Sequence, residues 1–255
     1  MSEKQPIDHT LDMPHAEGFT PAQELPVAKE KWKINAALVI IIGKPGTGKT
    51  ITANKMKEMY GLKIYKAGQN IRTESGANTA QVQYVDRPVA EDLSIDKQQI
   101  EIIRNSTPEN PKLIESHLGA WLAFQYRQEN KYPIVVIKLE GEEEKRHTRL
   151  QKRLKEAGES LSLAEIARRE KERAEKDRAQ WAEAYPDHPE LKTFDPYDDA
   201  FLDPRVDFTI NTSNLTVEQT QSAIHEKLQE RKMVEPKKPE EKQNGIEDHG
   251  QICLS

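Results

Sequence analysis

A short stretch at residues 43–50 carries the residue types from which a phosphate-binding loop is built. It reads Gly-Lys-Pro-Gly-Thr-Gly-Lys-Thr and fits the spacing G-x-x-x-x-G-K-[ST]. Glycines at such positions let the backbone turn tightly and bring its N–H groups onto phosphate oxygens. The lysine neutralises the terminal phosphates of a nucleoside triphosphate, and the hydroxyl that follows can ligate Mg²⁺. The motif therefore predicts a nucleoside triphosphate site, with ATP and Mg²⁺ as the expected cofactors.

The residues of this loop divide into three expected roles. The cofactor is expected to contact Gly43, Gly46, Thr47, Gly48, Lys49, Thr50 and Ile51. Lys49 is also expected to stabilise charge on the transferred phosphoryl group, and Thr50 to hold Mg²⁺. GTPases, motor ATPases and small-molecule kinases share this loop, so the loop alone does not name the phosphate acceptor. The sequence has no N-K-x-D motif for reading a guanine base and no room for a second ATPase subdomain. A small kinase is therefore favoured.

The segments around the loop alternate between strand-like and helix-like patterns. The apolar, β-branched run at 37–42 predicts a strand buried on both faces, and the helix expected at 49–60 ends at Gly61. Further strands are expected at 62–65, 112–115, 134–139 and 206–210, and further helices at 94–104, 119–127, 142–156, 162–184 and 217–231. This alternation predicts an α/β protein with the three-layer P-loop NTPase fold. Its five-stranded parallel sheet would be flanked by helices, with a helical lid at about 142–200.

The composition predicts a single domain with a tail at each end. Hydrophobic residues make up 35% of the 255 residues and charged residues 32%, so part of the chain is expected to be disordered. Residues 1–33 are polar and hold four prolines, and residues 233–255 are charged. We expect a disordered arm at 1–33, a kinase domain at 34–232 and a disordered tail at 233–255. The sequence does not predict protein partners of the tails.

Charge and cysteine content bear on partners and location. The net charge of −5 argues against a general nucleic-acid surface, so no nucleic-acid partner is expected. Cys253 is the only cysteine, which excludes an intramolecular disulfide. The N-terminus lacks the apolar core of a secretory signal, and the apolar run at 36–42 is too short to span a membrane. These features predict a cytoplasmic protein with no membrane partner.

Four further segments carry motifs that resemble one kinase family. They are Gly-Leu-Lys-Ile-Tyr-Lys-Ala-Gly-Gln-Asn-Ile-Arg at 61–72, Ser-Ile-Asp at 94–96, Leu-Ile-Glu-Ser-His-Leu-Gly-Ala-Trp at 113–121 and Asp-Phe-Thr-Ile-Asn-Thr-Ser at 207–213. With the loop, they resemble the P-loop nucleoside monophosphate kinases, and most of all the short cytidylate kinases, over residues 38–231. The resemblance implies transfer of phosphate from ATP to a small-molecule nucleotide substrate, with CMP or dCMP the favoured acceptor.

The resemblance also implies roles for residues outside the loop. The acceptor nucleotide would contact Gly68, Arg72 and His117, the donor base would lie against Asn211 and Thr212, and the lid would supply Arg169 and Arg178. The alternative for Arg72 is a surface arginine, and that for the lid is a solvated helix with pairs such as Glu165–Arg169.

Glu115 ends a strand expected beside the phosphate loop. A carboxylate there can hold Mg²⁺ through water. The alternative roles are a helix N-cap or an ion pair with Lys49.

Two residues depart from the family pattern. His117 stands where the family usually has an arginine, and Gln69 where it usually has an acidic residue. A neutral imidazole holds phosphate less strongly than a bidentate guanidinium. Two alternatives therefore remain open: a kinase of another small metabolite, with Asp86 or Asp96 near the acceptor hydroxyl, and a nucleotide-binding regulatory protein with little catalysis.

Overall fold

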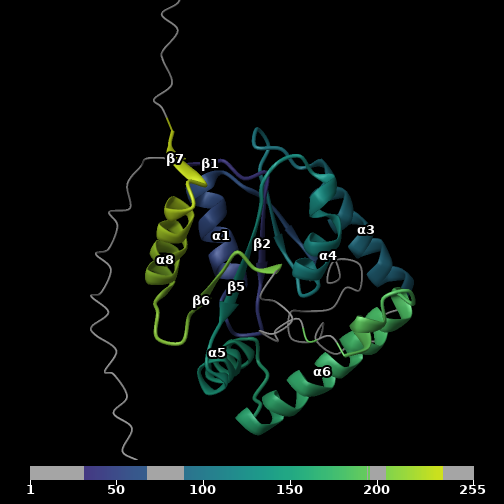
Figure 1. The fold of residues 1–255 in the computed structure, drawn as a ribbon. Coiled ribbons are helices and arrows are strands. Elements are labelled where there is room, and N and C mark those ends of the chain that lie inside the picture. Colours follow the sequence, from purple (N-terminus) through teal and green to yellow (C-terminus); the bar gives the residue numbers. More distant parts are fainter. Residues whose placement is uncertain (1–31, 68–88, 194, 196–204, 238–255) are drawn as a thin grey trace, which may run out of the picture.

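A five-stranded parallel sheet forms the centre of the molecule (Figure 1). The computed structural model describes residues 32–67, 89–193, 195 and 205–237. The strands lie in the order β3-β4-β2-β5-β6, and every neighbouring pair is parallel. They are β3 (Lys63–Lys66), β4 (Lys112–Glu115), β2 (Leu38–Ile42), β5 (Ile134–Glu140) and β6 (Phe208–Asn211). The expected three-layer α/β fold is confirmed.

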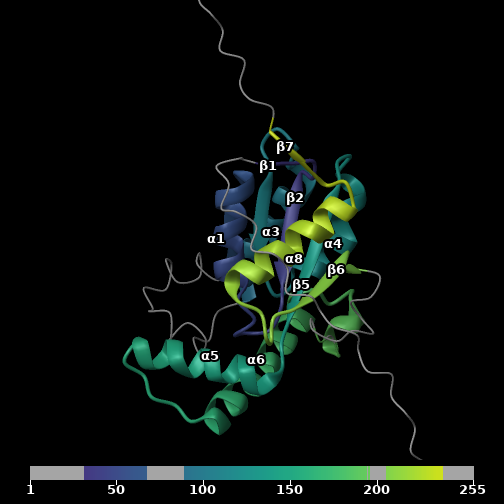
Figure 2. The same ribbon diagram turned by 90° about the vertical axis from the view of Figure 1, so that its left-hand side faces the viewer.

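Helices cover both faces of this sheet. Helices α1 (Lys49–Tyr60) and α8 (Val217–Glu230) lie on one face, which Figure 2 presents to the viewer. Helices α3 (Val89–Asn105) and α4 (Gly119–Tyr126) cover the other face, with the short helices η2 (Arg127–Glu129) and η3 (Pro189–Lys192). The expected helices are all present. The helix expected at 94–104 is longer than expected, since α3 runs from Val89 to Asn105 and Asp92 lies on its buried side.

The central strand explains why the phosphate loop lies in the middle of the sheet. All five residues of β2 are fully buried, because β4 and β5 pair with it on either side. Val39 and Ile41 pack toward α1 and α8, whereas Ile40 packs toward α4. A strand with helices on both faces must be apolar throughout. Its carboxyl end therefore leads directly into the loop at the centre of the sheet.

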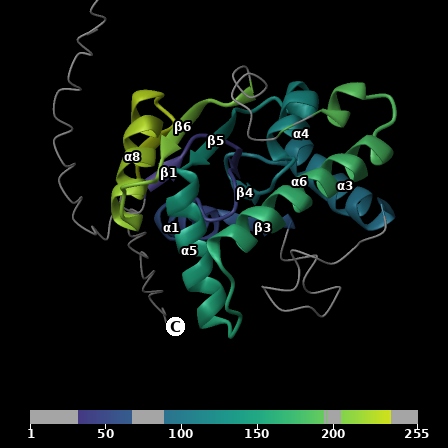
Figure 3. The same cartoon turned by 90° about the horizontal axis from the view of Figure 1, so that it is seen from below.

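Two long helices, α5 (Glu143–Glu156) and α6 (Leu163–Ala184), lie beyond the carboxyl ends of the strands (Figures 1 and 3). They pack on each other through a small apolar cluster of Leu150, Leu154 and Ile166. The far end of α6 is anchored differently, since Trp181 belongs to the large core cluster between the sheet and α4. Together α5 and α6 form the helical layer that the sequence predicts over this edge.

The boundaries expected for the arm and the tail need correction. Residues Trp32–Ile34 form strand β1, which pairs antiparallel with β7 (Val234–Pro236). Ile34 and Val234 are buried in the core cluster beside α8, so the folded unit extends beyond 34–232 at both ends. The sequence hides this pair because each strand has three residues and its partner lies about two hundred residues away. The rest of the arm and tail lies outside the described residues.

Among the residues that the structure describes, no helix combines the length and the apolar character needed to cross a membrane.

Candidate active site

The loop between β2 and α1 contains three glycines with positive φ angles, two of which also pack closely against neighbouring backbone. Gly43, Gly46 and Gly48 have φ angles of 148°, 83° and 92°. A Cβ atom on Gly43 would lie 2.2 Å from the Leu139 carbonyl oxygen, and one on Gly46 would lie 2.5 Å from the Arg146 carbonyl oxygen. The loop therefore combines left-handed backbone with close packing against β5 and α5. Its predicted position between a buried strand and a helix is confirmed.

Lys49 lies back along the loop. Its Nζ donates to the carbonyl oxygen of Gly43 at 2.6 Å and to that of Lys44 at 3.2 Å. The pKa of Lys49 is lowered to about 8, first of all by burial; the charges of Arg173, Arg153 and Arg146 lower it further, and Glu115 opposes the shift. A bound polyanion would be attracted by this whole group of cations.

Thr50, at the start of α1, and Glu115, at the end of β4, come together. Glu115 ends β4 opposite Ile41 of β2, and its Oε1 accepts a hydrogen bond of 2.7 Å from the Thr50 hydroxyl. Two hard oxygens thus lie at the start of α1, which is the ligand type that Mg²⁺ prefers. Among the described residues, no three His, Cys, Asp or Glu side chains gather into a metal site. These residues fit a Mg²⁺ ion that takes most of its ligands from water and phosphate.

Helix α5 supplies three arginines that the sequence reasoning missed. Arg149 donates to the Thr212 hydroxyl at 3.2 Å and to the Ser213 carbonyl at 3.1 Å. Arg146 and Arg153 are among the charges that act on Lys49. The signal that could have found them is their spacing, because positions i, i+3 and i+7 share one face of a helix.

Thr212 connects the loop after β6 to the phosphate loop. Its hydroxyl lies 2.9 Å from the Glu140 carbonyl oxygen and 3.2 Å from the Thr47 carbonyl oxygen. The Asn211 side chain stays local and accepts a hydrogen bond from the Ser213 amide at 2.9 Å. The structure thus brings Thr212, a residue expected in the donor site, against the phosphate loop.

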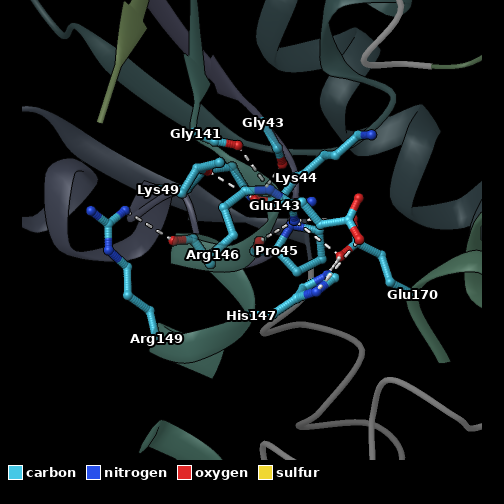
Figure 4. Close-up of polar contacts among 12 residues, drawn as sticks. Gly43, Lys44, Pro45, Lys49, Gly141, Glu143, Arg146, His147, Arg149 and Glu170 are labelled. Atoms are coloured by element: carbon cyan, nitrogen blue, oxygen red, sulfur yellow. Dashed lines mark hydrogen bonds and ion pairs between the residues drawn. The ribbon is translucent and has the colours of Figure 1, made fainter. Parts of the chain in front are cut away.

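Arg146 links the phosphate loop to α6 (Figure 4). The guanidinium donates to the carbonyl oxygens of Gly141 at 3.2 Å and Pro45 at 2.9 Å. Its Nη1 also lies 3.0 Å from both carboxylate oxygens of Glu170. His147 shares that carboxylate, with 2.7 Å between its Nε2 and Glu170 Oε2. We call Arg146, His147 and Glu170 the α5–α6 junction.

A cavity of about 270 Å³ lies between the phosphate loop and α6. Its walls include Lys44 and Pro45 from the loop, His117 before α4, and Arg178 and Trp181 from α6. Further charged groups on the walls are Glu143, Glu170, Lys171, Arg173, Glu175, Asp177 and Asp195. Two of the predicted site residues, His117 and Arg178, therefore meet at one cavity beside the loop.

The other predicted site residues lie elsewhere. Arg169 does not line the cavity: it donates to Glu165 at 2.8 Å and to Glu159 at 2.8 Å, so the helix pair weighed as the alternative is present. Ile51 exposes 46% of its surface on α1. Gly68 and Arg72 lie outside the described residues, as do Gln69 and Asp86.

Asp96 lies in the interior and not on the cavity wall. Only 6% of Asp96 is exposed, and its carboxylate accepts hydrogen bonds from the Tyr185 hydroxyl at 3.0 Å and from Gln99 Nε2 at 3.0 Å. It connects α3 to the end of α6. Asp96 is therefore poorly placed to act as a base on an acceptor hydroxyl.

Comparison with known proteins defines the family. The sequence model of one family, AAA_17, described as an AAA domain, matches residues 42–179, more than half of the chain. The chain belongs to this AAA domain family. The matched region of this AAA domain protein runs from the end of β2 into α6, and so includes the phosphate loop, Glu115 and the α5 arginines.

Curated relatives of this AAA domain protein include archaeal cytidylate kinases. It is 33% identical over 88 residues to the cytidylate kinase of Desulfurococcus amylolyticus, covering 33% of this chain and 46% of that protein. It is also 33% identical over 99 residues to that of Ignicoccus hospitalis, covering 37% and 55%. The chain thus spans about half the length of the curated relatives it matches. The predicted resemblance to cytidylate kinases is confirmed as a similarity of sequence.

Solved structures with related folds are more distant. An uncharacterized protein from Eubacterium ventriosum is 14% identical, with a TM-score of 0.49 over 75% of this chain and 98% of its own. A gluconokinase from Sinorhizobium meliloti is 12% identical, with a TM-score of 0.46 over 78% and 98%.

Proposed function

We propose that this protein transfers the terminal phosphoryl group of ATP to a nucleoside monophosphate, with CMP or dCMP as the favoured acceptor. One arrangement carries the proposal. Buried Lys49 and the Thr50–Glu115 pair lie at the end of the loop where α1 begins, and Lys44 and Pro45 of the same loop line a cavity. A triphosphate on the loop would therefore end beside a space for a second substrate. The sequence similarity to cytidylate kinases supports a nucleotide as that substrate.

The donor would be held mainly by the backbone of the loop and by Lys49. Left-handed glycines and the start of α1 direct N–H groups toward an anion, and the helix dipole adds to that attraction. Thr50 and Glu115 would hold Mg²⁺, and the ion would neutralise charge that develops between the phosphates. Arg149 fixes the loop containing Thr212 and Ser213, which we propose as part of the donor-base site.

The acceptor would enter the cavity between the loop and α6. Its phosphate oxygen would attack the terminal phosphorus of ATP, the bond to the bridging oxygen would break, and ADP and a nucleoside diphosphate would result. A phosphate monoester is largely ionised at neutral pH, with a second pKa of about 6, so no general base is needed. The buried, doubly hydrogen-bonded Asp96 fits this reaction better than it fits deprotonation of a hydroxyl.

The cavity wall supplies cations for this transfer. Of the two expected lid arginines, Arg178 lines the cavity and Arg169 does not, and Arg173 lines it as well. We therefore propose Arg178 and Arg173 as the α6 arginines that stabilise the transferring group. His117 on the same wall would contact the acceptor phosphate, together with Gly68 and Arg72.

An acceptor panel tests the proposal. The purified full chain is incubated with Mg²⁺ and ATP and with CMP, dCMP, UMP, AMP or GMP, or with hydroxyl acceptors such as gluconate and shikimate. The expected result is diphosphate formation, fastest with CMP or dCMP. Turnover only with a hydroxyl acceptor would overturn the nucleotide assignment. ATP binding without turnover on any acceptor would favour a regulatory nucleotide-binding protein.

A further inference from the structure

The Glu170 carboxylate is bound by side chains that lie beside the phosphate loop, Arg146 and His147. Both of its oxygens lie 3.0 Å from Arg146 Nη1, and one lies 2.7 Å from His147 Nε2. The side chain of Arg146 is 3% exposed and that of Glu170 is 19% exposed. A guanidinium donates to carboxylate and to phosphate oxygens through the same N–H groups, and here the single nitrogen Nη1 reaches both carboxylate oxygens. Glu170 therefore holds the group that an incoming phosphate would also bind.

The Arg146 guanidinium offers an incoming anion a first contact at Nη2, from which the anion could compete with Glu170 for Nη1. Its Nε and Nη1 are used by Gly141, Pro45 and Glu170, whereas Nη2 makes no hydrogen bond within the described part of the chain. Figure 4 shows the Arg146 side chain between Lys49 and Pro45 of the loop. The positive charge of Arg146 also reaches Lys49, whose pKa it helps to lower.

The α5–α6 junction is a polar tie between the loop and the middle of α6. Toward its start, α6 contributes only Ile166 to the buried apolar cluster with α5. Toward its end, α6 is anchored by Trp181 in the core and by the hydrogen bond from Tyr185 to Asp96. The segment between them carries the cavity-lining residues Glu170, Arg173 and Arg178. A change at Glu170 would therefore move the wall of the acceptor cavity.

We propose that Glu170 competes with the phosphates of the nucleotide for the guanidinium of Arg146, so that nucleotide binding loosens the tie between the phosphate loop and α6. This inference rests on the proposed function, because it requires a triphosphate on the loop. The carboxylate repels a polyanion at short range in a poorly solvated site. A nucleotide bound at the donor site would thereby change the position of α6, the helix that lines the acceptor cavity.

Calorimetry with the full chain tests this competition. ATP and inorganic tripolyphosphate are titrated into wild type, Glu170→Gln, Glu170→Asp and Glu172→Gln. Glu172→Gln is the matched control, because it removes one negative charge from an exposed position of the same helix. We expect Glu170→Gln to tighten binding of both ligands by about fivefold, an estimate from short-range charge repulsion in a partly screened site. Glu172→Gln and the charge-preserving Glu170→Asp should stay within about twofold of wild type.

The outcomes separate this inference from the proposed function. Weaker or unchanged binding by Glu170→Gln, with normal binding by wild type, would show that Glu170 is structural and would overturn the inference alone. Absence of ATP and tripolyphosphate binding by wild type would overturn the proposed function and the inference with it. Amide hydrogen exchange gives a second readout: ATP should speed exchange in residues 167–178 of wild type, and Glu170→Gln should exchange faster there even without ATP. Equal exchange in all four states would contradict the proposal.

Discussion

The phosphate loop and α6 face the same cavity but are held in place by different kinds of interaction. The loop is fixed by backbone: it follows a fully buried strand, its glycines pack against Leu139 and Arg146, and Lys49 binds its carbonyl oxygens. The middle of α6 is fixed by side chains, chiefly through Glu170. Under the proposed function, the donor side would be held by backbone, whereas the acceptor side would depend on ion pairs that a charged nucleotide could exchange.

The largest effect should come from removing the charge at the centre of the loop. We expect Lys49→Ala to lower kcat/KM for phosphoryl transfer by about a thousandfold or more, because Lys49 would stabilise charge in the transition state. The melting temperature should change little, since the Lys49 charge is buried at an energetic cost. Lys57→Ala, at the far end of α1, is the control. Turnover like that of wild type in Lys49→Ala would contradict the assignment of the loop.

The rigidity of the loop can be tested with two glycines that share a left-handed backbone. Gly46→Ala and Gly61→Ala both place a Cβ at positive φ, but only Gly46 meets a neighbouring atom, the Arg146 carbonyl oxygen at 2.5 Å. We expect Gly61→Ala to cost about 1–2 kcal/mol of unfolding free energy. Gly46→Ala should cost about 1–3 kcal/mol more, because the loop and α5 must separate. Urea denaturation measures both, and equal losses would show that the loop yields as easily as a helix end.

The proposed acceptor site can be tested at His117, which lines the cavity. His117→Arg replaces the imidazole with a guanidinium, and a bidentate charged contact binds phosphate more strongly than a neutral imidazole. We expect the KM for a nucleoside monophosphate to fall by about tenfold, since a charged hydrogen bond contributes about 1.5–3 kcal/mol. The KM for ATP should stay nearly unchanged. An unchanged or raised KM for every monophosphate would place His117 away from the acceptor phosphate.

The same contrast explains what could be predicted from the sequence. The loop, α1 and its end at Gly61 could be predicted because each depends on residues close in the sequence. These are the spaced glycines, the apolar strand before them and the left-handed cap at Gly61. Which arginines lie near the loop could not be predicted, because this depends on which face of α6 points toward the loop and on which arginines are already in ion pairs. Arg169 is held by Glu159, ten residues earlier, whereas Arg146 and Arg149 reach the loop from α5. The β1–β7 pair was hidden for a similar reason, since its partners meet only in the folded chain.

Buried Lys49 should make the Kd for ATP depend on pH. The pKa of Lys49 is about 8, so its ammonium loses its proton as pH rises through that value. Because the charged ammonium is the form that would bind phosphate, ATP binding above this pH must include uptake of a proton. We expect the Kd for ATP to be flat between pH 7 and 7.5 and to rise above pH 8, by at most about tenfold per pH unit. Lys49→Arg keeps its charge throughout this range, and its Kd should not change with pH. The same rise in Lys49→Arg would assign the titration to another group.

The smallest effect should come from trimming the ends outside the described residues. A chain of residues 32–237 keeps β1 and β7 and should melt within about 2 °C of the full chain, because the apolar-poor ends gain too little to offset their ordering entropy. A chain of residues 38–231 loses Ile34 and Val234 from the core and should melt several degrees lower, about 4 °C or more. Thermal unfolding followed by circular dichroism compares the three chains. Equal melting of both trimmed chains would show that the β1–β7 pair does not contribute to stability.

We propose that a phosphoryl group passes from the rigid loop to an acceptor in the cavity beside α6. The most direct measurement is a single turnover with excess protein, ATP labelled on its terminal phosphate, and CMP or dCMP. We expect the label to appear in the nucleoside diphosphate, only when the monophosphate is present, and not with Lys49→Ala. Release of the label as inorganic phosphate at the same rate with and without any monophosphate would contradict it.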